Sequence, residues 1–188
     1  MDPTGEYIVG TDGKAVSYSR GENGTIVWSK NASKDVQRVG NSMLQTQTGT
    51  EWFDKMRDAK HSVNIEIDNT EQTHTNLGSC EITMPDGSTD PNDVKKAKIT
   101  IFEQNIVKQI KEAPNKYGDF TVNEMIGSVG GHEGVHGTDE NNLWNAILIN
   151  LIKGADTDGF FLKSIEIKPN RVGSQILQEI RNAKKITD

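Results

Sequence analysis

The amino-acid sequence predicts an α+β fold, and three observations carry this prediction. Residues 63–68 alternate between apolar and polar side chains, which is the period of a half-buried strand. Residues 122–129 repeat apolar side chains at i, i+3, i+4 and i+7, which is one face of a helix. Strand and helix patterns are mixed before residue 121 and mostly helical afterwards, an order typical of α+β proteins. The 188 residues fit one compact domain.

The first 31 residues predict small β-hairpins. Short apolar segments at 7–9, 16–18 and 26–28 flank two turn dipeptides, Asp12-Gly13 and Asn23-Gly24, which favour positive φ. We therefore divide the chain into an N-terminal hairpin segment, 1–31, and a main domain, 32–188.

Further elements follow in order along the main domain. We expect a helix over 33–46 behind a Ser33 cap, helical turns at 52–56, strands at 63–68, 81–84 and 97–102, and a helix at 106–112 that ends at Pro114. The segment 99–102 has two interpretations that the pattern leaves open. It is either an edge strand that binds an extended peptide or an ordinary inner strand.

The C-terminal third is predicted to be helical. Thr121 and Glu124 have the spacing of a capping box, so a helix should begin there and continue through residue 136. An amphipathic stretch at 143–152 and a Gly- and Asp-rich loop at 154–159 follow. The last helix is expected to start at about Pro169, because proline suits the first turn of a helix.

Composition and charge exclude several classes of protein. A net charge of −6 argues against nucleic acid as the main partner, since such binding needs a basic surface. No apolar run has the length of a membrane span, and no signal peptide is recognisable. Cys80 is the only cysteine, so an intrachain disulfide is excluded.

The segment His132-Glu133-Gly134-Val135-His136 predicts a metal centre. Two histidines four residues apart lie on the same face of a helix, so both can bind one ion, and Zn²⁺ is the common choice. Glu133 lies beside that face, where it can accept a proton from water at the open metal position and pass it to a leaving group. Glu133 is therefore the predicted catalytic residue.

This pattern arises by chance on the order of once in two hundred shuffled sequences, so its context matters. Five glycines lie at 127, 130, 131, 134 and 137, and each costs a helix about 1 kcal/mol relative to alanine. Such costs are typical of functional sites. The alternative is a glycine-weakened surface helix with two solvated histidines.

Two carboxylates compete to be the third ligand. Glu166 precedes the last predicted helix, and folding can bring it to the metal, as a distant carboxylate completes many zinc sites. Asp139 follows His136 by three residues and stays on the ligand face only if the helix continues past Gly137. We favour Glu166, with Asp139 as the alternative and Glu140 as a weaker one.

Other polar and aromatic residues receive simpler interpretations. His61 and His74 are expected to be surface histidines. Tyr117 or Tyr7 could donate a hydrogen bond to an oxyanion, and the pattern does not choose between them. The three tryptophans are expected in the core, at positions 28, 52 and 144.

Two resemblances extend this interpretation. The segment Gly131 to Asp139 resembles the active-site helix of zincin metallopeptidases, whose two histidines bind zinc and whose glutamate is the general base. The segments 2–5, 12–14, 28–32 and 39–41 resemble the start of C-terminal toxin domains that follow Rhs/YD-repeat cores. Glu166 to Pro169 resembles the distal carboxylate segment of toxin metallopeptidases. The resemblance implies a zincin-like mixed sheet, with residues 1–31 at the junction to an upstream repeat core.

The expected function is therefore a zinc metallopeptidase that acts as an effector in bacterial competition. Its expected partners are a protein or peptide substrate and an immunity protein, and it would be secreted or exported as part of a larger protein. Two alternatives stay open: a non-catalytic binding or structural module at the end of a repeat protein, and a metal hydrolase of a non-peptide substrate.

Overall fold

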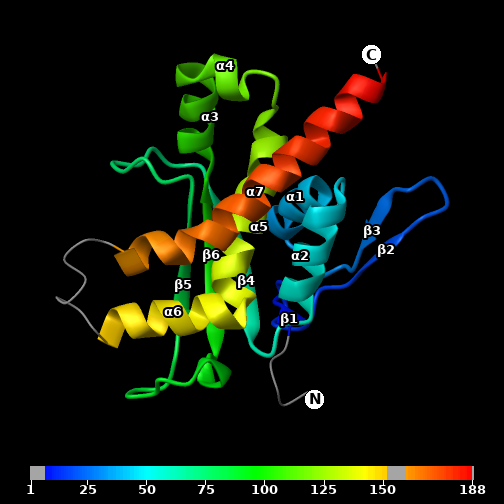
Figure 1. Cartoon of the computed structure of the whole chain (residues 1–188). Helices are drawn as coiled ribbons and strands as arrows, with labels where there is room; N and C mark the ends of the chain where they lie inside the picture. The colour runs from blue at the N-terminus through cyan, green and yellow to red at the C-terminus, as the bar shows by residue number, and fades with distance from the viewer. Residues whose placement is uncertain (1–6, 152–159, 188) are drawn as a thin grey trace.

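The computed structural model describes residues 7–151 and 160–187 (Figure 1). The described part is a mixed α/β structure with a four-stranded mixed sheet, a two-stranded hairpin and a set of helices. The sheet order is β1-β4-β6-β5, formed by Tyr7–Ile8, Ser62–Asp68, Lys96–Phe102 and Gly78–Thr83. β1, β4 and β6 are parallel, and β5 runs antiparallel to β6 at the edge.

The helices cover one face of this sheet. Val63, Ile65 and Ile67 of β4 are buried towards them, as their alternation predicts. The polar residues of the opposite face pair with one another, as in the Glu66–Lys98 ion pair between β4 and β6. The helices in chain order are α1 Lys34–Met43, α2 Gln47–Arg57, α3 Glu103–Glu112, α4 Pro114–Tyr117, α5 Val122–Thr138, α6 Glu140–Leu151 and α7 Phe160–Thr187, with a 3₁₀ turn at Pro91–Asp93.

α5 lies at the centre of the molecule, in contact with α1, α2, α3, α6, α7, β5 and β6. Figure 1 shows α7 running diagonally across it. Glycines permit this enclosure, because a Cβ at Gly130 would lie 2.8 Å from Val39 and one at Gly134 would lie 2.9 Å from Met56. Close packing of a buried helix thus accounts for these glycines, which the sequence pattern associates with a functional site.

The helix starts agree with the predicted caps. Ser33 accepts a hydrogen bond from the Val36 N–H, and Thr121 and Glu124 form the predicted capping box. The predicted N-terminal turns are present, with positive φ at Gly13 and Gly24. The hairpin is built from β2 Tyr18–Arg20 and β3 Ile26–Trp28. β1, by contrast, pairs with β4, so the described part of segment 1–31 contributes to the main sheet.

The last helix differs most from the prediction. α7 begins at Phe160, and Pro169 lies inside it. The carbonyl that Pro169 leaves unbonded, that of Ile165, accepts a hydrogen bond from Asn142 Nδ2 at 2.7 Å, which offsets part of the cost of a proline inside a helix. The predicted loop at 154–159 lies outside the described residues.

Several single residues also differ from the prediction. His61 is buried, with Nε2 2.8 Å from the carbonyl oxygen of Gly137, whereas His74 is exposed as expected. Trp52 is in the hydrophobic core, and the partly buried Trp28 packs against this core. Trp144 is 42% exposed on α6, so its prediction as a core residue is wrong. None of the helices described here has the length and apolar character that a membrane span requires.

Candidate metal centre

α5 presents His132 and His136 on one face, one turn apart. Their Nε2 atoms are 3.2 Å apart, and both rings face the same cleft. The helix is fixed in the core by buried residues such as Ile126 and Val135. Folding of this stretch as a long buried helix therefore turns a sequence spacing of four residues into a pair of adjacent imidazoles.

α7 adds the third side chain. The two carboxylate oxygens of Glu166 lie 3.2 Å from His132 Nε2 and 3.3 Å from His136 Nε2. α7 approaches α5 closely enough for Ser128 Oγ to donate to the Gly173 carbonyl at 2.9 Å. The structure thus brings together the three predicted ligands His132, His136 and Glu166, here called the ligand triangle.

The alternative third ligand lies elsewhere. Asp139 ends α5 with extended backbone angles, so its side chain leaves the ligand face. Its carboxylate pairs with Lys168 and accepts the Asn142 N–H. Glu140 begins α6 and is exposed. The geometry therefore selects Glu166 over both.

The ligand triangle contains donor types that metal ions bind. Two imidazoles and a carboxylate are a frequent donor set for zinc that keeps an open position. Tetrahedral zinc with bonds of about 2.0–2.1 Å separates its donor atoms by roughly 3.3 Å. The two Nε2 atoms are 3.2 Å apart, and each lies 3.2–3.3 Å from a different oxygen of Glu166. One ligand atom from each residue lies within 4.8 Å of the other two, so these side chains could hold a metal ion.

Charge and burial shift the pKa values of the cluster. Hydrogen bonds from His132 and His136 hold the pKa of Glu166 well below its usual range. Burial alone would lower the pKa of His136, but its bond to Glu166 and the nearby Glu133 raise it. Burial raises the pKa of Glu133, although the two histidines partly oppose this shift. The carboxylate bound to both histidines thus has a lowered pKa, whereas the pKa of Glu133 is raised.

Glu133 lies next to the ligand triangle and under the edge strand. Its Oε1 is 3.9 Å from His132 Nε2, and the residue is only 5% exposed. Gly78, at the start of β5, makes room for it, because a Cβ there would lie 2.8 Å from Oε1. The sequence analysis missed Gly78; its position before a polar strand gave no signal of a contact with Glu133.

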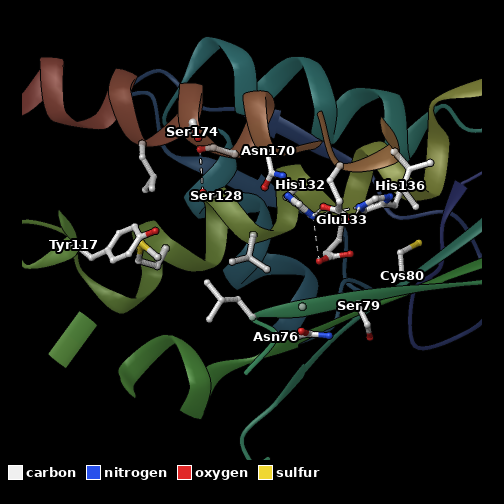
Figure 2. A pocket seen from close by; sticks show the side chains of 18 of the residues that line it. Asn76, Ser79, Cys80, Tyr117, Ser128, His132, Glu133, His136, Asn170 and Ser174 are labelled. Carbon is white, nitrogen blue, oxygen red and sulfur yellow. Dashed lines mark hydrogen bonds and ion pairs between the residues drawn. The ribbon is translucent and has the colours of Figure 1, made fainter. Parts of the chain in front are cut away.

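The ligand triangle opens into a cleft of about 790 Å³ between β5, α5 and α7. Figure 2 shows His136 towards one end of this cleft and Tyr117 towards the other. Apolar side chains also line this cleft, among them Met125 and Leu177. A second hollow of about 400 Å³ shares Cys80, Ile82 and Ala146 with this cleft. Together, the cleft and the second hollow extend along β5 past the ligand triangle.

β5 forms one edge of the sheet, and the interpretation of segment 99–102 as an edge strand is wrong. β6 is an inner strand paired with β4 and β5. The Phe102 N–H donates to the Leu77 carbonyl, so every second residue of β5 faces β6, and Gly78, Cys80 and Ile82 turn their backbone groups outward. Across 7–151 and 160–187, β5 has no strand partner on this side.

Neither predicted oxyanion donor lies at the ligand triangle. The Tyr7 hydroxyl donates to the Gly13 carbonyl in the N-terminal segment, and Tyr117 lies towards the far end of the cleft (Figure 2). Asn170, which the sequence analysis missed, lines the cleft beside His132 in Figure 2. It follows Glu166 by one helical turn and so shares its face of α7.

Comparisons with family models, with curated proteins and with solved structures find no match to this chain.

Proposed function

We propose that this chain is a zinc-dependent peptidase. One observation carries the proposal: the ligand triangle and the buried Glu133 face a single cleft whose wall is the open edge of β5. Metal ligands, a proton acceptor and a surface for an extended chain are the components that peptide hydrolysis requires. The resemblance of the motif helix to zincins points to the same activity.

His132, His136 and Glu166 would hold the zinc ion. Bound zinc supplies Lewis acidity, which polarises the scissile carbonyl and lowers the pKa of water. Glu133 accepts the proton of the attacking water and later donates it to the leaving amine. Burial in the cleft raises the pKa of Glu133, which makes its carboxylate a stronger base and so favours the first of these two proton transfers.

The open edge of β5 is the observation that favours a peptide as the substrate. Gly78, Cys80 and Ile82 present N–H and C=O groups along the cleft, and an extended chain can add to them as a further strand. Gly78 lies against both Val129 and Glu133, so this edge passes directly over the catalytic carboxylate. Asn170, on the opposite wall, is the side-chain amide that we assign to stabilise the oxyanion.

The biological setting follows from the second resemblance. We infer that the domain is the C-terminal effector of a larger exported protein and that an immunity protein binds it in the producing cell. The resemblance of the first 41 residues to toxin domains after Rhs/YD-repeat cores supports this inference.

The test combines metal content with cleavage. The chain and its Glu133→Gln and His132→Ala variants are purified without chelator, zinc is measured by inductively coupled plasma mass spectrometry, and peptide pools are digested and read by mass spectrometry. We expect near-stoichiometric zinc and cleavage for the natural chain, zinc without cleavage for Glu133→Gln, and neither for His132→Ala.

Other results would assign other functions. Zinc without peptide cleavage, even after reconstitution, would favour a hydrolase of a non-peptide substrate. Absence of zinc from the natural chain, with melting unaffected by chelator, would favour a binding module in which the histidines are incidental.

A further inference from the structure

The proline inside α7 leaves one backbone carbonyl without its helical partner. Pro169 has no N–H, so the carbonyl of Ile165, four residues earlier, cannot receive the usual helical bond. Asn142, in the first turn of α6, donates Nδ2–H to that carbonyl at 2.7 Å. A side chain from another helix thus replaces the bond that the proline removes.

The other end of the same amide contacts the ligand triangle. Asn142 Oδ1 lies 2.8 Å from His136 Nδ1. Asn142 is 4% exposed, and its backbone N–H donates to Asp139 Oδ1 at 3.1 Å. Its amide is therefore fixed in position and has both ends in contact with other groups.

The Ile165 carbonyl decides which way this amide faces. A carbonyl oxygen only accepts hydrogen bonds, so the NH₂ of Asn142 must point to it. The amide oxygen then faces His136, and it can only accept a proton from Nδ1. The Nε2 atom of a neutral His136 is left with its lone pair, and it faces His132 and Glu166.

We propose that Pro169 and Asn142 form a positioning pair for the metal centre. Pro169 frees the Ile165 carbonyl, that carbonyl orients the Asn142 amide, and the amide holds His136 in the tautomer that binds a cation through Nε2. Ile165 directly precedes Glu166, so one amide ties the α5 ligand to the α7 ligand. The inference rests on the proposed metal centre and extends it to two residues outside the ligand set.

The first measurement is zinc affinity of the full chain, by competition with a chromophoric chelator. Asn142→Leu removes both amide bonds at similar volume, and we expect the dissociation constant for zinc to rise about 10- to 100-fold, the usual effect of losing a group that orients a metal ligand. Asn141→Leu, at the adjacent exposed position of α6, is the matched control and should leave the affinity unchanged.

Pro169→Ala tests the other member of the pair. Alanine restores the helical N–H, so the Ile165 carbonyl no longer depends on Asn142. We expect the melting temperature to rise, because proline is the poorest residue in a helix interior, while the dissociation constant for zinc rises several-fold. Asn142→Leu should then cost less affinity in the Pro169→Ala chain than in the natural one.

A metal-free measurement reads the tautomer directly. In the Glu166→Ala chain, which removes the carboxylate that competes for the His136 proton, long-range ¹H–¹⁵N correlation spectra are recorded at a pH where both imidazoles are neutral. We expect the His136 proton on Nδ1. Addition of Asn142→Leu should move it largely to Nε2.

Two results would overturn the positioning pair: a proton on Nε2 of His136 in the Glu166→Ala chain, or zinc affinities of Asn142→Leu and Pro169→Ala equal to that of the Asn141→Leu control. If Asn142→Leu does not fold, the zinc affinity of Pro169→Ala alone decides the test, because this substitution removes proline from the helix interior and should not prevent folding. A natural chain that binds no zinc would refute the proposed function, and the tautomer would still decide whether Asn142 orients His136.

Discussion

The two halves of α7 are held to the rest of the molecule by different forces. The C-terminal half inserts Val172, Ile176 and Ile180 into the core. Arg181 and Lys184 form ion pairs with Asp119 and Glu124 near the start of α5. The half before Pro169 carries Glu166, and among its residues with described side chains, 163–168, polar contacts hold it to the rest of the molecule: the bond from Asn142 to the Ile165 carbonyl and the ion pair of Lys168 with Asp139. Ile167, in this half, is 69% exposed.

This difference separates stability from metal binding within one helix. Apolar burial in the C-terminal half fixes the direction of α7 across α5, and it stabilises the fold whether or not an ion is bound. The N-terminal half positions a ligand through a few hydrogen bonds, each of which contributes only about 1 kcal/mol. We therefore expect core substitutions to change the free energy of unfolding, and substitutions near Glu166 to change metal affinity.

The largest expected effect is on the core side of this comparison. Ile176 is fully buried against Gly131 of α5, so Ile176→Ala should lower the free energy of unfolding by about 2–5 kcal/mol. Ile167→Ala makes the same chemical change in the other half at an exposed position and should stay within about 0.5 kcal/mol. Urea denaturation of the metal-free chains measures both. Equal losses would show that the two halves are packed alike.

Zinc binding should depend on the N-terminal half of α7, in contrast to the stability of the metal-free chain. An ion that binds only the folded chain adds about 2.7 kcal/mol to the free energy of unfolding at one hundred times its dissociation constant. We expect this gain for the natural chain and for Ile167→Ala, and none for Glu166→Ala. Denaturation with and without zinc measures it. A full gain for Glu166→Ala would remove this carboxylate from the ligand set.

The sequence predicted the elements whose signal is local. The alternation in β4, the Ser33 cap and the capping box at Thr121 each depend on neighbouring residues, and the structure has all three. The motif spacing likewise predicted the pairing of His132 with His136, because one helix turn brings them together. The preference for Glu166 over Asp139 depends in part on the resemblance to toxin metallopeptidases, and the place of Glu166 in the ligand triangle depends on the crossing of α7 over α5.

The predictions that failed depend on contacts between distant segments. Proline is favoured at a helix start, but Pro169 lies inside α7, where Asn142, 27 residues earlier, donates to the freed carbonyl. His61 is buried, and the partner of its Nε2 is the carbonyl oxygen of Gly137, 76 residues later, at 2.8 Å. Which strand lies at the sheet edge is likewise decided by pairing and not by strand composition. None of these contacts leaves a periodic signal in the sequence.

A smaller effect should come from Glu179, in the C-terminal half. Its carboxylate accepts hydrogen bonds from the N–H and hydroxyl of Thr48 in the first turn of α2. A negative charge at a helix N-terminus is favourable, so Glu179→Ala should cost about 1 kcal/mol of unfolding free energy and leave zinc affinity unchanged. Gln178→Ala, at the neighbouring exposed position, is the control for loss of a polar side chain on the same turn. A change in zinc affinity for Glu179→Ala would contradict the separation of the two halves.

The smallest expected effect concerns the ion pair of Arg181 with Asp119, and it depends on pH. The hydrogen bond from Arg181 lowers the pKa of Asp119 below its ordinary value of 3.8. A carboxylate with a lowered pKa in the folded state stabilises the protein above its unfolded-state pKa, and this stabilisation is lost as the pH falls through the folded-state value. Asp119→Asn should therefore cost less than about 1 kcal/mol near neutral pH, because the pair is largely exposed, and the two chains should converge in acid. Urea denaturation across a pH series gives this difference. A difference in unfolding free energy that persists in acid would mean that Asp119 acts through packing. The charge of Asp119 would then contribute nothing to the stability of the C-terminal half.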